Sequence, residues 1–484
     1  MPMRLCFKTC TATLALFMAL LAPARADFDA LSALADSGAA ISAVAIDLET
    51  NKTLGSLNAA TRLAPASVSK IIVAAKALNT WPADRSFVTH LYAANFPVNG
   101  VINGDLYLST EGDSALDHES FIDLASQLHG AGVNRVTGGV VVVTAPFATL
   151  QCETQDRCDA MTKSSTAYNA LIAGLGVDYG AWCVEIRGTQ PRKPALVSSC
   201  EGVPMPIAVE GGITTAGPGQ RASWWVDRRT EEGTDRLLVG GTVSAGDLQT
   251  VYRAMSDPAR GAGLLMRETL RSVGVAVQGG IKVRSAAAPA SVVEVGRIES
   301  LSLQEQLGRM LRFSNNYIAD ILTMNMAAAN GSSISSLADA AVGLNQYVAA
   351  ANGTPGNPPL LYSGSGLTPE SQISAQEVAG LLAAEHRNTR NFNAFYGGLV
   401  VPRNAPFRFL RGGSAGWQDR VALKPGTMND PRSVCGIAGY IRKSNGGFIA
   451  FAMLVNGGPR YKHVPLYKAM EAIRADVDVL LNNS

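Results

Sequence analysis

Residues 64–70 read APASVSK and lead directly into the apolar run 71–78. Pro65 is typical of a helix start, and the apolar run predicts that a helix follows. Ser67 and Lys70 are three residues apart, so a helix places them on one face, where the lysine amine can reach the serine hydroxyl. Burial in an apolar cleft, or a second lysine nearby, lowers the pKa of a lysine enough for it to act as a base. The spacing therefore indicates a nucleophile, Ser67, activated by Lys70.

Two later motifs extend this pattern. Residues 314–316 read SNN, an S-x-N motif, and precede an apolar helix pattern over 317–322. Residues 424–427 read KPGT and begin a strand pattern that continues through 434–441. S-x-x-K, S-x-N and K-x-G motifs together form the catalytic set of serine β-lactamases and penicillin-binding proteins. Each motif is short enough to occur by chance, so their order and surroundings carry the hypothesis.

With these motifs the chain resembles the serine penicillin-binding proteins, and specifically the D-alanyl-D-alanine carboxypeptidase/endopeptidase family with a large insertion after the nucleophile helix. The resemblance extends along nearly the whole chain beyond the N-terminal segment. Further stretches that resemble signatures of that family are GDLYL (104–108), GDSAL (112–116), VTGGV (136–140), GSGL (364–367) and FAMLVN (451–456). The resemblance implies an α+β fold of the DD-peptidase/β-lactamase-like type, in which helices cover an antiparallel sheet.

The hydrophobic pattern independently favours such a sheet. Residues 41–47 and 53–57 are predicted to form two short strands around a polar turn. Residues 434–442 and 448–456 flank a turn with two glycines, which predicts a hairpin. The final stretch, 466–481, has one apolar helical face. Its polar face carries both acidic and basic residues, which favours packing on the core over binding to an anionic membrane surface.

The spacing of the motifs predicts a discontinuous catalytic domain. Residues 27–95 and 300–484 are assigned to it, and residues 96–299 are too many for a loop and rich in short β-like runs. This stretch is expected to form one or two β-rich inserted domains, and the alanine- and proline-containing segment 286–289 marks the return to the catalytic domain. Scaffolding, partner contact and shaping of the cleft all stay open as roles for the insertion.

The N-terminus predicts export. Arg4 and Lys8 precede the apolar run 12–22, and residues 24–26 form a small-x-small cleavage signal. We expect a signal peptide over residues 1–26 and a periplasmic protein without a membrane span, because the apolar run is too short to cross a bilayer. Removal of the peptide leaves 38 basic against 39 acidic residues. This balance, without a basic run, argues against nucleic-acid binding.

Five cysteines remain after that cleavage, in an oxidising compartment. Cys152, Cys158, Cys183 and Cys200 allow three pairings, among which the sequence does not decide, while Cys435 lies in an apolar strand pattern typical of a buried thiol. The five histidines show no metal-ligand spacing, and no phosphate-binding loop occurs. No metal or cofactor is expected.

The resemblance implies acyl transfer on peptidoglycan stem peptides. Ser67 is expected to attack the carbonyl between two D-alanines while Lys70 accepts its proton, after which water hydrolyses the acyl-enzyme. β-Lactams are expected to inhibit by forming stable esters on Ser67.

The resemblance also assigns roles around this pair. Ser314 is expected to relay a proton to the leaving amine, and Asn316 to hydrogen-bond the acyl amide. Lys424 is expected to lower the pKa of Lys70 and to attract the substrate carboxylate. Gly426 and Thr427 are assigned to substrate binding, and the backbone N–H groups of Ser67 and Thr427 to the oxyanion hole.

Two positions depart from the family pattern. Pro425 stands where the family has Thr or Ser, which removes a hydroxyl expected to hold the substrate carboxylate. The proline is tolerable if its strand lies at a sheet edge, and Thr427, Arg420 or Arg432 are candidates to replace the contact. Ser363 replaces a usual aspartate, in what we interpret as a structural position.

Two alternative functions follow from these departures and from the fold. The first is a β-lactamase or esterase on the same fold, which Pro425 makes more plausible than usual, and the second is a non-catalytic wall-binding scaffold. The sequence leaves open the oligomeric state and the balance between carboxypeptidase and endopeptidase work.

Overall fold

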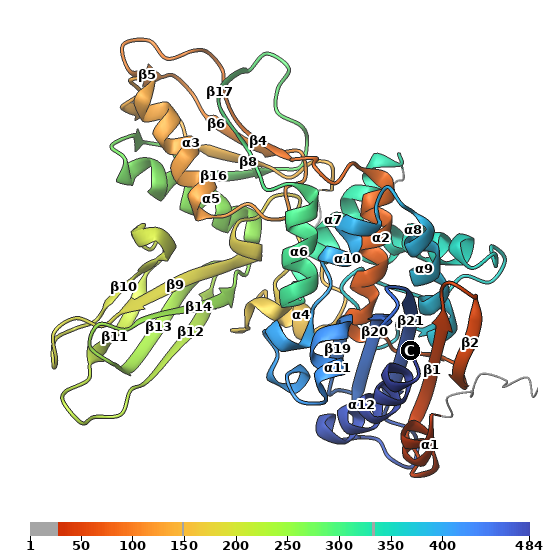
Figure 1. Ribbon diagram of the computed structural model, residues 1–484. Helices are drawn as coiled ribbons and strands as arrows, with labels where there is room; N and C mark the ends of the chain where they lie inside the picture. Colours follow the sequence, from red (N-terminus) through yellow and green to blue (C-terminus); the bar gives the residue numbers. More distant parts are fainter. Residues whose placement is uncertain (1–27, 148–149, 332–333) are drawn as a thin grey trace, which may run out of the picture.

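The structure is a computed structural model that describes residues 28–147, 150–331 and 334–484. The expected signal peptide lies outside the described residues. An antiparallel sheet with the strand order β19-β20-β21-β1-β2 lies at the centre of the catalytic half, on the right of Figure 1. Its strands are β1 (Ala40–Asp47), β2 (Lys52–Leu57), β19 (Val421–Met428), β20 (Val434–Arg442) and β21 (Phe448–Asn456). The two predicted strand pairs are confirmed.

Both faces of this sheet are buried. In β21, Ala452 and Leu454 belong to the core on one face, whereas Phe451 and Met453 belong to the core on the other. Successive side chains of a strand point to opposite faces, so an apolar run such as FAMLVN fits a sheet covered on both sides. The result is a helix–sheet–helix sandwich.

Helices cover the two faces unequally. Helix α2, which begins at Lys70, is fully buried over Ile71–Ala75, as its uninterrupted apolar run requires. The hydrophobic core on the face of the sheet that α2 covers is shared by the helices α2 (Lys70–Thr80), α6 (Leu303–Phe313), α7 (Asn316–Ala329), α8 (Leu337–Ala351), α9 (Ala375–Arg387) and α10 (Phe392–Gly397). The opposite face carries α1 (Asp29–Asp36), α11 (Ala415–Arg420) and α12 (Leu466–Asn482). None of the helices in the described ranges combines the length and hydropathy needed to cross a bilayer.

The chain between α2 and α6 forms a β-rich region with a separate core, on the left of Figure 1. Its main sheet has the order β16-β8-β6-β4-β17 and packs against α3 (His118–Gly130) and α5 (Pro258–Ser272). The strands of that sheet are β4 (Val88–Ala93), β6 (Leu106–Thr110), β8 (Val140–Val143), β16 (Ile281–Arg284) and β17 (Val293–Glu299).

Within the described residues, three smaller three-stranded sheets belong to this region and contribute side chains to the same core. The two sheets with the longer strands consist of β9 (Ala181–Arg187), β10 (Leu196–Ser199), β11 (Val209–Thr215), β12 (Ser223–Glu231), β13 (Thr234–Val243) and β14 (Leu248–Ala254). The remaining short elements are β3 (Arg62–Leu63), β5 (Val101–Ile102), β7 (Arg135–Val136), β15 (Ala276–Val277), β18 (Ile373–Ser374) and α4 (Gln155–Asp159).

The chain leaves and re-enters the catalytic half at one point. Phe87 packs in the core around α2, whereas Leu91 in β4 packs in the core of the β-rich region. The Ser300 N–H donates to the Phe87 carbonyl at 3.0 Å. The sequence predicted an inserted region over residues 96–299. We propose instead that it runs from Val88 to Glu299.

The cysteines pair in sequence order. The disulfides are Cys152–Cys158 and Cys183–Cys200, both in the β-rich region, and Cys435 is a buried free thiol in β20. One of the three pairings that the sequence allowed is therefore selected.

The first and last helices are joined by Asp476. Helix α1 has no side-chain cap of its own, and the buried Asp476 carboxylate accepts from the N–H groups of Ala30 (3.1 Å) and Leu31 (2.9 Å). We expect Asp476→Ala to lower the free energy of unfolding by about 1–3 kcal/mol, because two N–H groups lose their acceptor. Unfolding in denaturant measures the free energy of unfolding, and Lys468→Ala, which changes an exposed residue on the same helix, is the control. Equal stabilities for Asp476→Ala and wild type would contradict the prediction.

Candidate active site

Ser67 lies in a 3₁₀ turn, Ala66–Ser69, immediately before α2 begins at Lys70. The predicted helix therefore starts one turn later than expected, and the serine sits in the tighter turn ahead of it. A loop packs closely on this turn: Gly366 has a φ of +71°, and a Cβ there would lie 2.0 Å from the Ala66 carbonyl oxygen. The glycine in the GSGL stretch is thus required for the approach of this loop.

The Lys70 amine is fully buried and has three close oxygen neighbours. It lies 2.8 Å from Ser67 Oγ, 2.7 Å from Asn316 Oδ1 and 2.7 Å from the Ser365 carbonyl oxygen. Burial lowers the pKa of Lys70 to about 7, because an ammonium group is poorly solvated there. The spacing of Ser67 and Lys70 thus produces the contact that the sequence predicted.

The second and third motifs contact each other through Lys424 and Ser314. Lys424 Nζ lies 2.9 Å from Ser314 Oγ and 2.7 Å from the Pro425 carbonyl oxygen. Ser314 joins α6 to α7 with a φ of +57°, which turns the chain between the two helices. Burial, and then the charge of Lys70, lower the pKa of Lys424 well below its usual range. Two amines in one buried site disfavour each other's protonation.

Strand β19 lies directly against the turn that holds Ser67. A Cβ at Gly426 would lie 2.6 Å from the Pro65 carbonyl oxygen and 2.8 Å from the Ser67 nitrogen, so only glycine fits without movement. This contact brings the segment of Thr427 next to Ser67. The two N–H groups expected to form an oxyanion hole therefore belong to adjoining segments.

Pro425 occupies an edge strand, as expected. β19 is the outermost strand of the sheet and pairs with β20. Arg420 was a candidate to replace the missing hydroxyl. Its guanidinium instead donates to the carbonyl groups of Arg442 (2.8 Å) and Leu481 (3.1 Å), at the opposite end of the strand. That part of the prediction is therefore wrong. Arg432 is exposed and follows Pro431 at the cleft rim.

A cleft of about 620 Å³ opens onto Ser67. Ser314, Pro425 and Thr427 line it together with Ser67, while Lys70 is buried behind the serine. The other lining residues are Thr154, Gln155, Asp156, Tyr168, Asn169, Phe313, Leu367, Pro369, Phe407, Phe409, Met428, Asn429, Asp430 and Pro431. The β-rich region thus contributes to the cleft through residues 154–156 and 168–169.

Sequence reasoning missed these contributions from the inserted region. The signal that could have found them is the short spacing of Cys152 and Cys158, because a disulfide there closes a tight loop that presents residues 154–156. It also missed the Ser365 carbonyl and Asp320, which lies fully buried behind it. Ser363 is fully buried, with its Oγ 3.3 Å from Ser365 Oγ. Within the described ranges, no three His, Cys, Asp or Glu side chains are grouped as metal ligands.

Known proteins share both the sequence pattern and the fold. A D-alanyl-D-alanine carboxypeptidase from Actinomadura sp. is 28% identical over 465 residues, covering 90% of this chain and 81% of that protein. Penicillin binding protein 4 from Haemophilus influenzae has a TM-score of 0.72 at 20% identity, over 93% of this chain and 99% of that chain. A predatory peptidoglycan endopeptidase from Bdellovibrio bacteriovorus has a TM-score of 0.54 at 14% identity, over 92% and 93%. The two structures show a shared fold, which confirms the predicted fold class.

The family profile adds the relationship in sequence. The profile described as D-Ala-D-Ala carboxypeptidase 3 (S13) family matches residues 25–482, a range that includes all three motifs and the β-rich region between them. The chain belongs to this family of penicillin-binding serine carboxypeptidases.

Proposed function

We propose that this protein performs its family's reaction through an acyl-enzyme on Ser67, releasing the terminal D-alanine of peptidoglycan stem peptides. The observation that carries the proposal is the buried Lys70 amine, 2.8 Å from a serine hydroxyl that faces a cleft. Peptidoglycan lies outside the cytoplasmic membrane, so the family supports extracytoplasmic work. We further propose the periplasm as the compartment, since the N-terminal sequence resembles a signal peptide and the protein has two disulfides.

The neighbours of Lys70 favour a role as general base. A neutral amine has two N–H groups and one lone pair. The Asn316 and Ser365 carbonyl oxygens are acceptors only, so they take the two N–H groups. The lone pair then faces the Ser67 hydroxyl, which donates to it. With a pKa of about 7, a large fraction of Lys70 is in this form at neutral pH.

Lys424 and Ser314 are proposed to act on the other end of the scissile bond. The 2.9 Å contact lets Lys424 deliver a proton through Ser314 to the leaving amine. A substrate carboxylate beside Lys424 favours its charged form and so offsets the effect of burial. The charge on Lys424 is therefore tied to the presence of substrate. Ser67 and Thr427 N–H groups are proposed to stabilise the oxyanion, which is worth about 3 kcal/mol per donor.

A β-lactam is proposed to acylate the same serine. The Haemophilus influenzae relative has been crystallised in complex with a β-lactam. The decisive experiment has two parts. The protein is incubated with penicillin, and the adduct is located by peptide mass spectrometry. In parallel, D-alanine release from a pentapeptide and cleavage of a cross-linked dimer are assayed. An adduct on the Ser67 peptide together with D-alanine release supports the proposal, and dimer cleavage adds endopeptidase work. Rapid loss of the adduct indicates a β-lactamase, and no adduct on folded protein indicates a scaffold.

Pro425 gives a test of carboxylate recognition. We expect Pro425→Thr to lower KM for a D-alanyl-D-alanine peptide about fivefold with little change in kcat, because one added hydrogen bond contributes about 1 kcal/mol. Steady-state kinetics measures both constants, and Pro369→Thr, at another position lining the cleft, is the control. An unchanged KM would place carboxylate recognition on other residues.

A further inference from the structure

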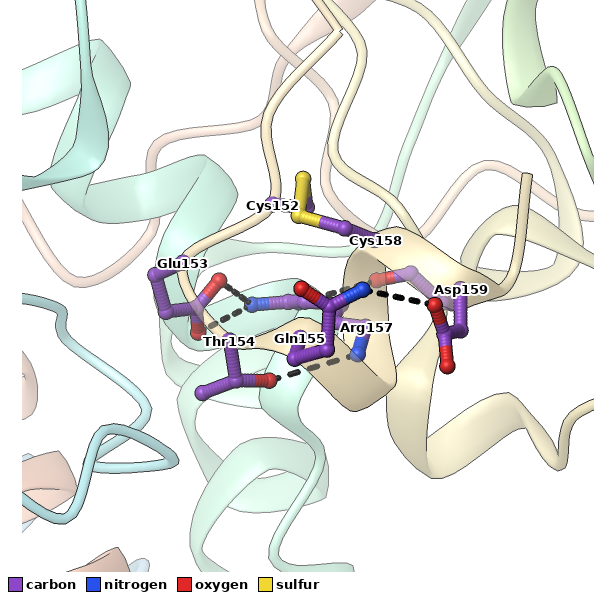
Figure 2. Close-up of a disulfide and its surroundings, with 8 residues drawn as sticks. Cys152, Glu153, Thr154, Gln155, Arg157, Cys158 and Asp159 are labelled. Carbon is purple, nitrogen blue, oxygen red and sulfur yellow. Dashed lines mark hydrogen bonds and ion pairs between the residues drawn. A yellow bond between two sulfur atoms is a disulfide. The ribbon is translucent and has the colours of Figure 1, made fainter.

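The disulfide Cys152–Cys158 closes a loop that holds a buried arginine. Arg157 lies in α4, and its side chain is fully buried. One guanidinium nitrogen, Nη1, lies 2.6 Å from Glu153 Oε2 and 2.8 Å from Asp320 Oδ2. Figure 2 shows Arg157 facing the Glu153 carboxylate within the loop that the disulfide closes. A buried charge of this kind requires such partners, and neither acid was assigned a role in catalysis.

One chain of hydrogen bonds connects Arg157 to the base through Asp320. Asp320 lies on α7, one turn after Asn316, so both side chains are on the same helical face. While Asp320 Oδ2 accepts from Arg157, Oδ1 accepts from the Ser365 N–H at 2.8 Å. The Ser365 carbonyl oxygen is one of the acceptors of Lys70, at 2.7 Å. Arg157 thus helps to fix Ser365, the residue whose carbonyl group holds the amine.

A second chain of hydrogen bonds runs through the adjacent 3₁₀ turn. Arg157 Nε donates to the Ala170 carbonyl oxygen at 2.7 Å. Two residues earlier, the Tyr168 carbonyl oxygen accepts from Asn316 Nδ2 at 3.0 Å, and Asn316 Oδ1 is the other acceptor of Lys70. Both carbonyl acceptors that orient the Lys70 lone pair therefore depend on Arg157.

The charges around Lys70 oppose one another. Burial is the main cause of its lowered pKa, Asp320 and Glu153 raise that pKa, and Arg157 lowers it. Lys424 faces the site from β19, and its pKa is lowered by burial and by Lys70. Without Arg157, the carboxylate of Asp320 would favour the protonated, catalytically inert form of Lys70.

We propose that Arg157 is a positioning residue for Lys70, which holds its two acceptors in place and offsets the charge of Asp320. This inference rests on the proposed role of Lys70 as the base that activates Ser67. It assigns the inserted region a part in positioning the base, since Arg157 is contributed by the loop that also lines the cleft.

The test is the pH dependence of acylation by a fluorescent penicillin. In Arg157→Met the acid limb of the rate profile is expected to move to higher pH, because Lys70 loses a neighbouring positive charge and Asp320 loses its partner. On that limb the rate falls about tenfold for each unit of pKa change. Arg157→Lys, which keeps the charge, is expected to restore the profile in part. Asp320→Asn, which removes the negative charge, is expected to shift the limb to lower pH.

A matched control separates this effect from general loss of stability. Arg228 is also buried and ion-paired, with its Nη1 2.9 Å from Asp235 Oδ1, and it braces the segment after α4 through the Ala160 carbonyl oxygen. Its carboxylate partner is Asp235 rather than Asp320. Arg228→Met is therefore expected to lower thermal stability and to leave the pH profile unchanged.

The outcomes distinguish this inference from the proposed function. A wild-type protein that is not acylated overturns the proposed function itself. If the wild type is acylated but Arg157→Met keeps its acid limb, or moves it no more than Arg228→Met does, the positioning role is wrong. If Arg157→Met does not fold, Asp320→Asn decides: a shift to lower pH supports the role, and no shift or the opposite shift overturns it.

Discussion

Replacing Lys70 by methionine is expected to slow acylation of Ser67 by penicillin about a thousandfold, the typical contribution of a positioned general base. Methionine is close to lysine in length and fits the buried path of the side chain, but it has no lone pair to accept the serine proton. The Ser67 hydroxyl would then keep only its weak intrinsic nucleophilicity. The rate of label incorporation, followed by gel fluorescence, measures the effect.

The stability of this variant provides an independent check. Burial places the pKa of Lys70 at about 7, below its usual value, so the unfolded chain binds a proton more tightly than the folded one. Above the usual lysine pKa, burial of Lys70 therefore costs no stability. As the pH drops toward 7, the unfolded chain takes up a proton first, and the free energy of unfolding falls. Lys70→Met removes this loss and is expected to be at least as stable as wild type at neutral pH.

Two controls complete the test of Lys70. Ser67→Ala gives the blank, and Lys76→Met, on the same helix but over the Tyr347 ring, is expected to acylate at the wild-type rate. A Lys70→Met protein that acylates as fast as wild type would show that another group takes the proton.

Adding a single methyl group at Gly426 is expected to lower the acylation rate about a hundredfold. The new Cβ of Gly426→Ala would lie 2.6 Å from the Pro65 carbonyl oxygen and 2.8 Å from the Ser67 nitrogen, both backbone atoms. Strand β19 must therefore move away from the turn that holds Ser67, and misplacement by about 1 Å of groups that orient a reaction costs about this much. Stopped-flow acylation by a chromogenic cephalosporin measures the rate.

Gly308→Ala is the matched control for Gly426→Ala. Gly308 lies in α6 with open space where its Cβ would stand, and alanine favours helix there. We expect normal acylation and unchanged or raised stability. Equal acylation rates for the two variants would mean that the strand and the turn do not need their close contact.

Local patterns were enough to predict much of the catalytic half. The strand pairs, the hairpin before β21 and the apolar face of α12 were predicted because each depends on residues close in sequence. The three motifs also led to Ser67, Lys70 and Lys424, which the structure brings together. The catalytic roles of these residues stay predictions until the variants are measured.

The rest of the site depends on contacts that a local pattern does not encode. The Ser365 acceptor is a backbone oxygen, and any residue type can supply one. Arg157 and Asp320 come from distant parts of the chain, and only the fold brings them together. Likewise, β4 was assigned to the catalytic half because its strand pattern does not tell which sheet it joins.

We expect the order of the strands to determine when the enzyme becomes active. In the central sheet β1 pairs with β2, its neighbour in sequence, and with β21, where Ala43 lies opposite Met453, so this second partner is available only after almost the whole chain has been made. Contacts this distant form late, because the entropy of closing a very long loop must be overcome first. Most of the β-rich region packs on its own core, which can form earlier. Because the turn that holds Ser67 packs against β19 and β20, we expect an incomplete or newly made chain to carry no reactive serine until its C-terminal strands have joined the sheet.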